Sequence, residues 1–240
     1  MRFLITNDDG VNTEGLKLLA RKANKYGDVI VVAPFREQSA KSHAISIRKG
    51  LEFYELDDVV EGVKTYAVNG TPADCVRVAR YYLKDNFDVV LSGINNGYNL
   101  GEDILYSGTV GAATEGVQAN AKAIAFSSKY NSLDFADEWF DKVFTFIFDN
   151  GLLDRVNLIN VNFPLNPRGI KIAKQGSTNF ETHFPYENDL IWQKGKPNFD
   201  LDKDPDTDVY NINNSYITVT PLLINRTDFE AFEEFKILVK

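Results

Sequence analysis

The chain has 240 residues, a formal net charge of −8 and 44% hydrophobic residues. This composition excludes a disordered or collagen-like chain and indicates a globular protein with a sizeable core. One cysteine and two histidines exclude a disulfide framework and a multi-Cys/His zinc site, and they fit a reducing cytoplasm. The acidic balance argues against binding to nucleic-acid polymers, and no apolar run approaches the roughly 20 residues of a membrane span.

The first two thirds of the chain alternate between β-branched runs and helical patterns. This alternation predicts an α/β fold, a doubly covered parallel sheet. The predicted strands are 2–6, 28–33, 66–68, 88–91, 123–127 and 156–162. The predicted helices are 15–26, one that opens at 71, 107–119 and 134–149. In the second of these helices Thr71 is the expected N-cap, Pro72 occupies the first turn and Asp74 stands at the capping-box position.

The pattern changes after Pro164. Residues 175–208 are polar, rich in aromatics and weakly periodic, and a loose loop of that length is rare in a compact domain. A strand at 215–222 and a short helix at 227–235 follow, and Thr227 and Glu230 of this helix have capping-box spacing. We therefore expect a single domain, 1–240, with an α/β core of about 1–165 and a C-terminal part, about 166–240, that contains an extended arm or hairpin packed elsewhere, a second subunit being one candidate surface. The helix offers three phenylalanines for burial, Phe229, Phe232 and Phe235.

Ligands of open parallel sheets bind at the carboxyl ends of the strands, near the point where the strand order reverses. The first predicted strand ends in Asp8, Asp9 and Gly10. Two adjacent carboxylates are costly to bury without a partner, and a divalent cation with oxygen ligands would offset their repulsion. The ordinary alternative is a solvated turn in which an aspartate caps the next helix.

Other unusual residues follow the next predicted strands and open one predicted helix. Ser39 lies after the second strand, and Asn95 and Asn96 lie in a loop after 88–91 that is rich in asparagine and glycine. Asparagine offers a neutral oxygen ligand and an amide donor. The helix start at 107–109, Ser-Gly-Thr, offers free N–H groups and two hydroxyls to a phosphate, although an ordinary N-cap has the same sequence.

Five sequence blocks mark the first 128 residues: NDDG, VVAP followed by QSA, NGTPADCV, SGINNGYNLG and YSGTVGAATEG. In order and spacing these blocks resemble the motifs of the SurE family of metal-dependent nucleotide phosphatases. The resemblance implies a Rossmann-like three-layer fold whose C-terminal elements are exchanged between subunits of a homodimer or homotetramer. Tyr98 departs from the family pattern, and 175–198 is hard to align.

The resemblance also assigns roles by position. It implies one divalent metal ion per subunit, and all-oxygen ligation favours Mg²⁺ or Mn²⁺. The implied metal ligands are Asp8, Asp9, Ser39 and Asn95. The implied phosphate-binding residues are Asn96, Ser107, Gly108 and Thr109. Asp8 and Asp9 are also the candidate catalytic residues, and the sequence leaves open whether either accepts a proton.

The expected activity is hydrolysis of nucleoside 5′-monophosphates, with 3′-monophosphates as a second candidate substrate. The alternative is a Mg²⁺-binding receiver-like signalling domain, which also carries paired acids after its first strand. A receiver needs a phospho-acceptor aspartate at the end of its third strand, and the run 88–91 is followed by Ser92. A dinucleotide-dependent dehydrogenase lacks support because no Gly-x-Gly-x-x-Gly turn follows the first strand.

Four further features are assigned structural roles. The alternating aspartates between 200 and 208 lack the glycine and the glutamate that a calcium-binding EF-hand loop requires. His43 lies near Ser39 in the sequence, and we expect a structural or surface histidine. Cys75 and the aromatic stripe of 135–147 are expected to pack in the core.

Overall fold

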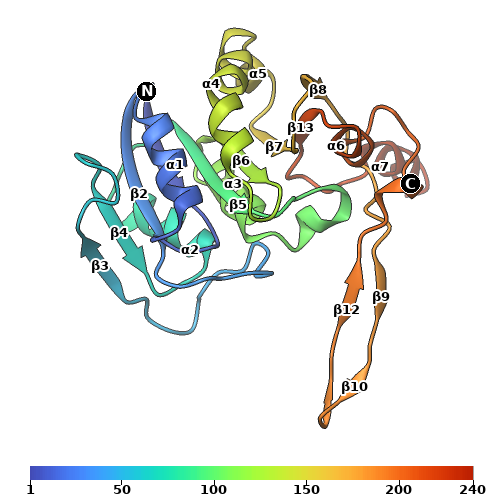
Figure 1. The fold of residues 1–240 in the computed structure, drawn as a ribbon, viewed down its shortest axis with the longest axis horizontal. Helices are drawn as coiled ribbons and strands as arrows, with labels where there is room; N and C mark the ends of the chain where they lie inside the picture. Colours follow the sequence, from blue (N-terminus) through green and yellow to red (C-terminus); the bar gives the residue numbers. More distant parts are fainter. Residues whose placement is uncertain (240) are drawn as a thin grey trace.

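A computed structural model describes residues 1–239 and contains a central nine-stranded sheet (Figure 1). Its strands are β1 (Arg2–Thr6), β2 (Asp28–Pro34), β3 (Phe53–Leu56), β4 (Thr65–Val68), β5 (Val89–Asn96), β6 (Lys122–Ser128), β7 (Leu158–Phe163), β8 (Ile170–Ile172) and β13 (Ile217–Leu222). The strand order is β3-β4-β2-β1-β5-β6-β7-β13-β8. The six strands from β4 to β7 are parallel, whereas β3 and β13 pair antiparallel with β4 and β7. The predicted α/β fold is confirmed, with antiparallel strands added toward both edges.

Helices cover both faces of the sheet and produce three layers. The α-helices are α1 (Glu14–Ala23), α2 (Pro72–Arg77), α3 (Gly108–Gln118), α4 (Asp134–Asp149), α5 (Leu152–Arg155), α6 (Asp208–Asn213) and α7 (Phe229–Lys236). On one face, α1 and α4 bury Leu16 and Phe140, and on the other α2 and α3 bury Val76 and Ala113. The central strands are therefore apolar on both sides, which explains their continuous hydrophobic runs.

Local sequence signals place most of these elements correctly. The capping box of α2 is confirmed, since Asp74 N donates to Thr71 Oγ1 (3.1 Å) and Thr71 N donates to Asp74 Oδ2 (2.9 Å). One expectation is wrong: residues 92–96 are not a loop but continue β5. After an irregularity between Ser92 and Asn95, this segment pairs again with β6, so ladder hydrogen bonds outweigh the turn preference of its glycine and asparagines.

The strand order reverses beside β1. β1 pairs with β2 on one side and with β5 on the other, and all three strands are parallel. The chain therefore moves outward in opposite directions from β1, and the crevice between the loops after β1 and β5 is the expected position for a ligand.

The C-terminal part contains the predicted hairpin arm and one helix that sequence patterns missed. Two short antiparallel ribbons, β9 (Glu181–His183) with β12 (Lys194–Lys196) and β10 (Tyr186–Glu187) with β11 (Leu190–Ile191), extend from the body (Figure 1). After α6, β13 returns to the sheet beside β7.

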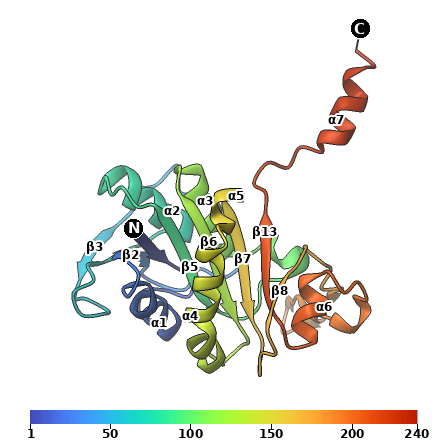
Figure 2. The same ribbon diagram turned by 90° about the horizontal axis from the view of Figure 1, so that it is seen from above.

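The last helix, α7, projects away from the sheet (Figure 2). Phe229, Phe232 and Phe235 are all exposed in this chain. The expected cap at Thr227 is wrong, because the helix starts at Phe229 and Asp228 Oδ1 accepts the N–H of Ala231 at 2.9 Å. Among residues 1–239, no helix combines the length and the apolar character needed to cross a bilayer.

Candidate active site

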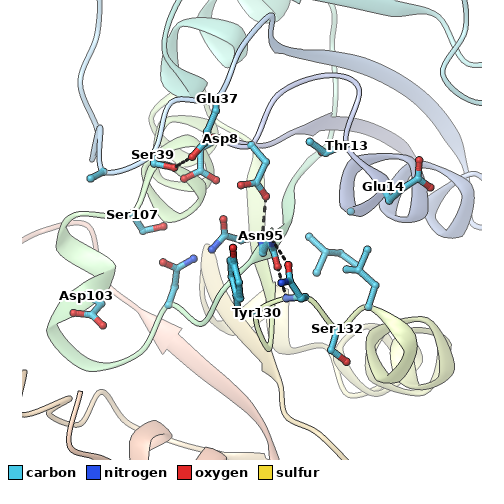
Figure 3. Close-up of a pocket in the computed structure, with 18 of the residues that line it drawn as sticks. Asp8, Thr13, Glu14, Glu37, Ser39, Asn95, Asp103, Ser107, Tyr130 and Ser132 are labelled. Atoms are coloured by element: carbon cyan, nitrogen blue, oxygen red, sulfur yellow. Dashed lines mark hydrogen bonds between the residues drawn. The ribbon is translucent and has the colours of Figure 1, made fainter. Parts of the chain in front are cut away.

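A cavity of about 710 Å³ opens at the carboxyl ends of β1 and β5. Figure 3 shows the side chains that converge on it from the loops after β1, β2 and β5, from the start of α3 and from the loop after β6. Six of the eight site residues expected from the sequence line it: Asp8, Asp9, Ser39, Asn95, Asn96 and Ser107. The structure therefore brings six of the expected site residues together in one crevice.

Asp8 lies beneath the cavity surface and is almost completely buried. Its Oδ1 accepts a hydrogen bond from the hydroxyl of Thr109, on the first turn of α3. Burial raises the pKa of Asp8 to about 6, because it penalises the charged form; the Thr109 hydrogen bond lowers the pKa and the charge of Asp9 raises it further. A nearby cation would remove this penalty.

Asp9 is less buried and faces the end of β5. Its Oδ2 accepts the backbone N–H of Asn96 at 3.1 Å, which links the loops after β1 and β5. Burial also raises the pKa of Asp9; the Asn96 hydrogen bond lowers it, and the charge of Glu37 raises it. Two adjacent carboxylates with raised pKa values are what a cation-binding site presents before its cation is bound.

The neutral candidate ligands are also oriented by their neighbours. Asn95 Nδ2 donates to the carbonyl of Gly97 at 2.8 Å, so the amide oxygen is the group left for the cavity. Ser39 Oγ donates to Glu37 Oε1 at 2.5 Å. Residues 1–239 hold no cluster of three or more His, Cys, Asp or Glu suited to a metal. A metal bound here would therefore need the Ser39 hydroxyl and the Asn95 amide oxygen as ligands besides the two aspartates. This all-oxygen set fits Mg²⁺ or Mn²⁺.

The expected phosphate-binding residues divide into two groups. Asn96 and Ser107 line the cavity, and Ser107 Oγ also caps α3 by accepting the N–H of Val110 at 3.0 Å. Gly108 and Thr109 are buried behind them, and the hydroxyl of Thr109 is used by Asp8. Gly108 and Thr109 therefore support the Asp8 carboxylate and do not themselves line the cavity.

Sequence patterns missed several residues of the cavity. Glu37, Asn99, Asp103, Tyr106, Tyr130 and Asn131 all contribute to its lining. Asn131 is tied to Asn96, because its N–H donates to Asn96 Oδ1 at 2.7 Å. The loop after β6 carries no motif, and only its position at a strand end identifies it as part of the site.

Asn99 lines the cavity and is hydrogen-bonded to two buried asparagines of β7. Its N–H donates to Asn162 Oδ1 at 2.9 Å, and its carbonyl accepts from Nδ2 of Asn160 and of Asn162 at 2.8 and 2.9 Å. Its own Nδ2 donates to Ser127 Oγ at 2.8 Å. The alternation of asparagine with apolar residues in INVNF was the sequence signal for this network.

His43 has a structural partner. Its Nε2 lies 2.6 Å from Oε2 of the buried Glu115 on α3, and Arg77 Nη1 lies 2.8 Å from Oε1 of the same carboxylate. Burial raises the pKa of Glu115, but the hydrogen bonds from His43 and Arg77 outweigh it, so the net pKa is lowered. Cys75 is fully buried in the cluster formed with α2 and α3, as expected.

Comparison with known proteins decides the family. A family model described as Survival protein SurE matches residues 3–182. The chain belongs to the SurE family. A protein from Clostridium botulinum (strain ATCC 19397 / Type A) named 5′-nucleotidase SurE is 40% identical over 247 residues, with 98% of this chain and 97% of that protein covered. A protein of the same name from Alkaliphilus metalliredigens is 39% identical, with 98% of each chain covered.

Structural comparison agrees with the sequence. The crystal structure of the SurE protein from Aquifex aeolicus matches this chain with a TM-score of 0.81 and 33% sequence identity, over 100% of both chains. The likeness therefore includes the C-terminal arm as well as the α/β core. The SurE resemblance of the motifs in the first 128 residues is confirmed.

Proposed function

We propose that this SurE-family chain is a divalent-metal-dependent phosphatase that hydrolyses nucleoside 5′-monophosphates to nucleoside and phosphate. The observation that carries the proposal is the convergence of Asp8, Asp9, Ser39 and Asn95 beside the start of α3, in one cavity. Relatives that match this chain over nearly its full length are named 5′-nucleotidase. Nucleoside 3′-monophosphates are the second candidate substrate.

The oxygen donors of the site would hold one Mg²⁺ or Mn²⁺ per subunit. When bound, the ion supplies positive charge that polarises a phosphoryl oxygen. Asp8 and Asp9 contribute the negative charge that retains the ion, and their hydrogen bonds to Thr109 and to the Asn96 backbone fix their orientation. These two aspartates are therefore the residues on which the reaction depends most.

Asn96 and Ser107 would bind the phosphate oxygens. Both side chains line the cavity, and Ser107 lies at the N-terminus of α3, where the helix dipole favours an anion. In the transition state negative charge is spread over the phosphoryl oxygens, and donors fixed in advance would stabilise it without reorganisation. The net charge of −8 is no obstacle, because the local positive potential comes from the helix and the ion.

The experiment is a phosphate-release assay with the purified chain, AMP or GMP as substrate, and Mg²⁺ or Mn²⁺. We expect phosphate release, its loss in a chelator, and at least about a 100-fold lower kcat in Asp9→Asn. Full activity of Asp9→Asn, or activity that survives chelation, would contradict the proposal. Adenosine 3′-monophosphate in the same assay tests the second substrate.

The receiver-like alternative predicts a different outcome. Incubation with a small phosphodonor followed by intact-mass measurement would show a stable phosphoryl adduct on a receiver and no adduct on a phosphatase. The crevice supports the phosphatase, since β5 ends in asparagines rather than in a phospho-acceptor aspartate.

Residues 1–240 would act as a single domain, and its C-terminal elements would be exchanged in a homodimer or homotetramer. The exposed aromatics of α7 and of the ribbon at 181–196 support this assembly, because apolar groups at such density are normally covered. A cavity of about 640 Å³ between α3 and β13, lined largely by apolar residues, offers a surface for such a contact. A reducing cytoplasm would suit the single, buried Cys75.

A further inference from the structure

Ser39 is the candidate metal ligand whose position depends least on regular structure. It is exposed and lies in the irregular segment between β2 and β3. A serine hydroxyl is neutral and rotates freely, so it is a weak ligand unless a neighbour fixes it. In Figure 3 the neighbour is Glu37, whose Oε1 accepts the Ser39 hydroxyl at 2.5 Å. A hydrogen bond to a carboxylate is charge-assisted and therefore stronger than one to a neutral acceptor.

The direction of this hydrogen bond matters for a cation. The hydroxyl has one hydrogen and two lone pairs, and the hydrogen points at Glu37, so both lone pairs of Oγ remain for a ligand. A carboxylate that accepts this hydrogen also increases the electron density on Oγ, which makes it a better donor to a cation. Glu37 thus both orients the Ser39 hydroxyl and strengthens it as a ligand.

The other candidate ligands are supported in the same way. Asp8 is held by Thr109, Asp9 by the N–H of Asn96, and the Asn95 amide by the carbonyl of Gly97. Each of these partners also lies next to a strand end or a helix start. For Ser39 the support comes from a charged side chain two residues away in the same loop.

The geometry of the loop keeps Glu37 and Ser39 at the cavity. The N–H of Gln38, between them, donates to the carbonyl of Asp8 at 2.7 Å and anchors the segment to the loop after β1. Glu37 lines the cavity near Asp9, and its hydrogen bond there is the one that it accepts from the Ser39 hydroxyl.

We propose that Glu37 is a positioning residue that holds the Ser39 hydroxyl as a ligand of the divalent cation. This inference rests on the metal site of the proposed function and adds a residue outside the set expected from the family resemblance. It concerns cation affinity, so it is measurable without substrate.

The test is a double-mutant cycle of Mn²⁺ binding measured by isothermal titration calorimetry. The variants are Glu37→Ala, Ser39→Ala and the double substitution, with the exposed Glu61→Ala as the matched control. We expect about a 10- to 100-fold weaker Kd in Glu37→Ala, the usual effect of removing a group that supports a ligand. In the Ser39→Ala background the same change should weaken Mn²⁺ binding by less than about 3-fold, because the hydroxyl that it supports is gone.

Glu37→Gln separates position from charge. Glutamine keeps a carbonyl acceptor for the Ser39 hydroxyl and loses the negative charge, so its Kd should lie between those of wild type and Glu37→Ala. Equal weakening by Glu37→Ala in both backgrounds would mean that Glu37 acts by charge alone and would overturn the proposal. An unchanged Kd in Glu37→Ala or Ser39→Ala, or a wild type that binds no Mn²⁺, would also overturn it.

Failure of the proposed function looks different. A chain that binds Mn²⁺ with the expected coupling between Glu37 and Ser39, and releases no phosphate from any nucleoside monophosphate, would contradict the phosphatase and leave this inference standing. Both side chains are exposed, so the variants should keep the wild-type melting temperature, which circular dichroism checks.

Discussion

Gly108 packs against the carboxylate of Asp8 with no space for a side chain: a Cβ on Gly108 would lie 2.8 Å from Asp8 Cβ and 3.0 Å from Asp8 Oδ2. Both residues are buried. The glycine at the start of α3 is therefore what allows the helix to approach the loop after β1. This approach also lets Thr109 reach the same carboxylate.

We predict that Gly108→Ala displaces Asp8 and damages the cation site. Displacing a fixed group by about 1 Å costs up to about 100-fold in rate, so we expect kcat/KM for AMP to fall by about 10- to 100-fold and Mn²⁺ binding to weaken. Gly50→Ala is the control, because no atom lies within 4 Å of a Cβ at that position. Wild-type kinetics and Mn²⁺ affinity in Gly108→Ala would show that Asp8 has more freedom than its packing indicates.

The raised pKa of Asp8, about 6 rather than 3.8, predicts pH-dependent stability of the metal-free protein. The folded state binds this proton more tightly than the unfolded chain does, so the stabilisation is fully present below pH 3.8 and is lost as pH rises through about 6. The shift is equivalent to at most about 3 kcal/mol. In a chelator, the melting temperature of wild type should therefore fall, relative to that of Asp8→Asn, between pH 4.5 and 7. If differential scanning calorimetry shows that the melting temperatures of wild type and Asp8→Asn change with pH in parallel, Asp8 does not have this role.

Asp208 joins the C-terminal part of the chain to the loop after β5. Its buried carboxylate accepts the N–H groups of Gly101, Gly176 and Val209 at 3.1, 2.8 and 2.8 Å. Asp208→Ala leaves these donors without their acceptor, so we expect the free energy of unfolding in urea to fall by about 2–4 kcal/mol. Asp206→Ala, at an exposed position of the same loop, should change it by less than about 0.5 kcal/mol. Equal effects of the two substitutions would argue against the role given to Asp208.

The exposed phenylalanines of α7 predict that self-association depends on this helix. Phe232 and Phe235 are about half exposed or more in this chain, at 49% and 64%. The double substitution to serine removes apolar area from any interface, so light scattering coupled to size exclusion should show a smaller assembly than wild type. Glu234→Ala changes a polar position of the same helix and should leave the mass unchanged. A wild-type mass for the phenylalanine variant would exclude α7 from the interface.

The elements that sequence predicts well are those fixed by local patterns. The helix Asp134–Asp149 has the predicted bounds because its apolar residues recur at helical spacing, and β2 follows from a continuous apolar run. The end of β5 was missed because Ser92–Asn96 has the composition of a turn, and only pairing with β6 makes it a strand. The helix α6 is only six residues long, so its periodicity is too short to detect.

The residues of the site also divide into those that local patterns predict and those that only tertiary packing decides. Strand ends and motif resemblance place Asp8, Asp9 and Asn95 correctly at one cavity. The partner of Thr109 was not predictable, because a hydroxyl at a helix start serves a phosphate or a neighbouring carboxylate equally well, and the packing of α3 on β1 decides between them. The contact between Glu37 and Ser39 depends on how one loop folds back over the sheet, and no periodic pattern encodes that.

The amide network around Asn99 has a consequence for how the pocket responds to acid. Asn160 and Asn162 hold Asn99 through amide groups, which carry no charge and take up no proton in the physiological range. The part of the wall that Asn99 contributes should thus keep its shape from mildly acidic to mildly alkaline solution. A change of the pocket over that range can then be traced to its carboxylates, which makes Asn99 a constant reference for titration by NMR.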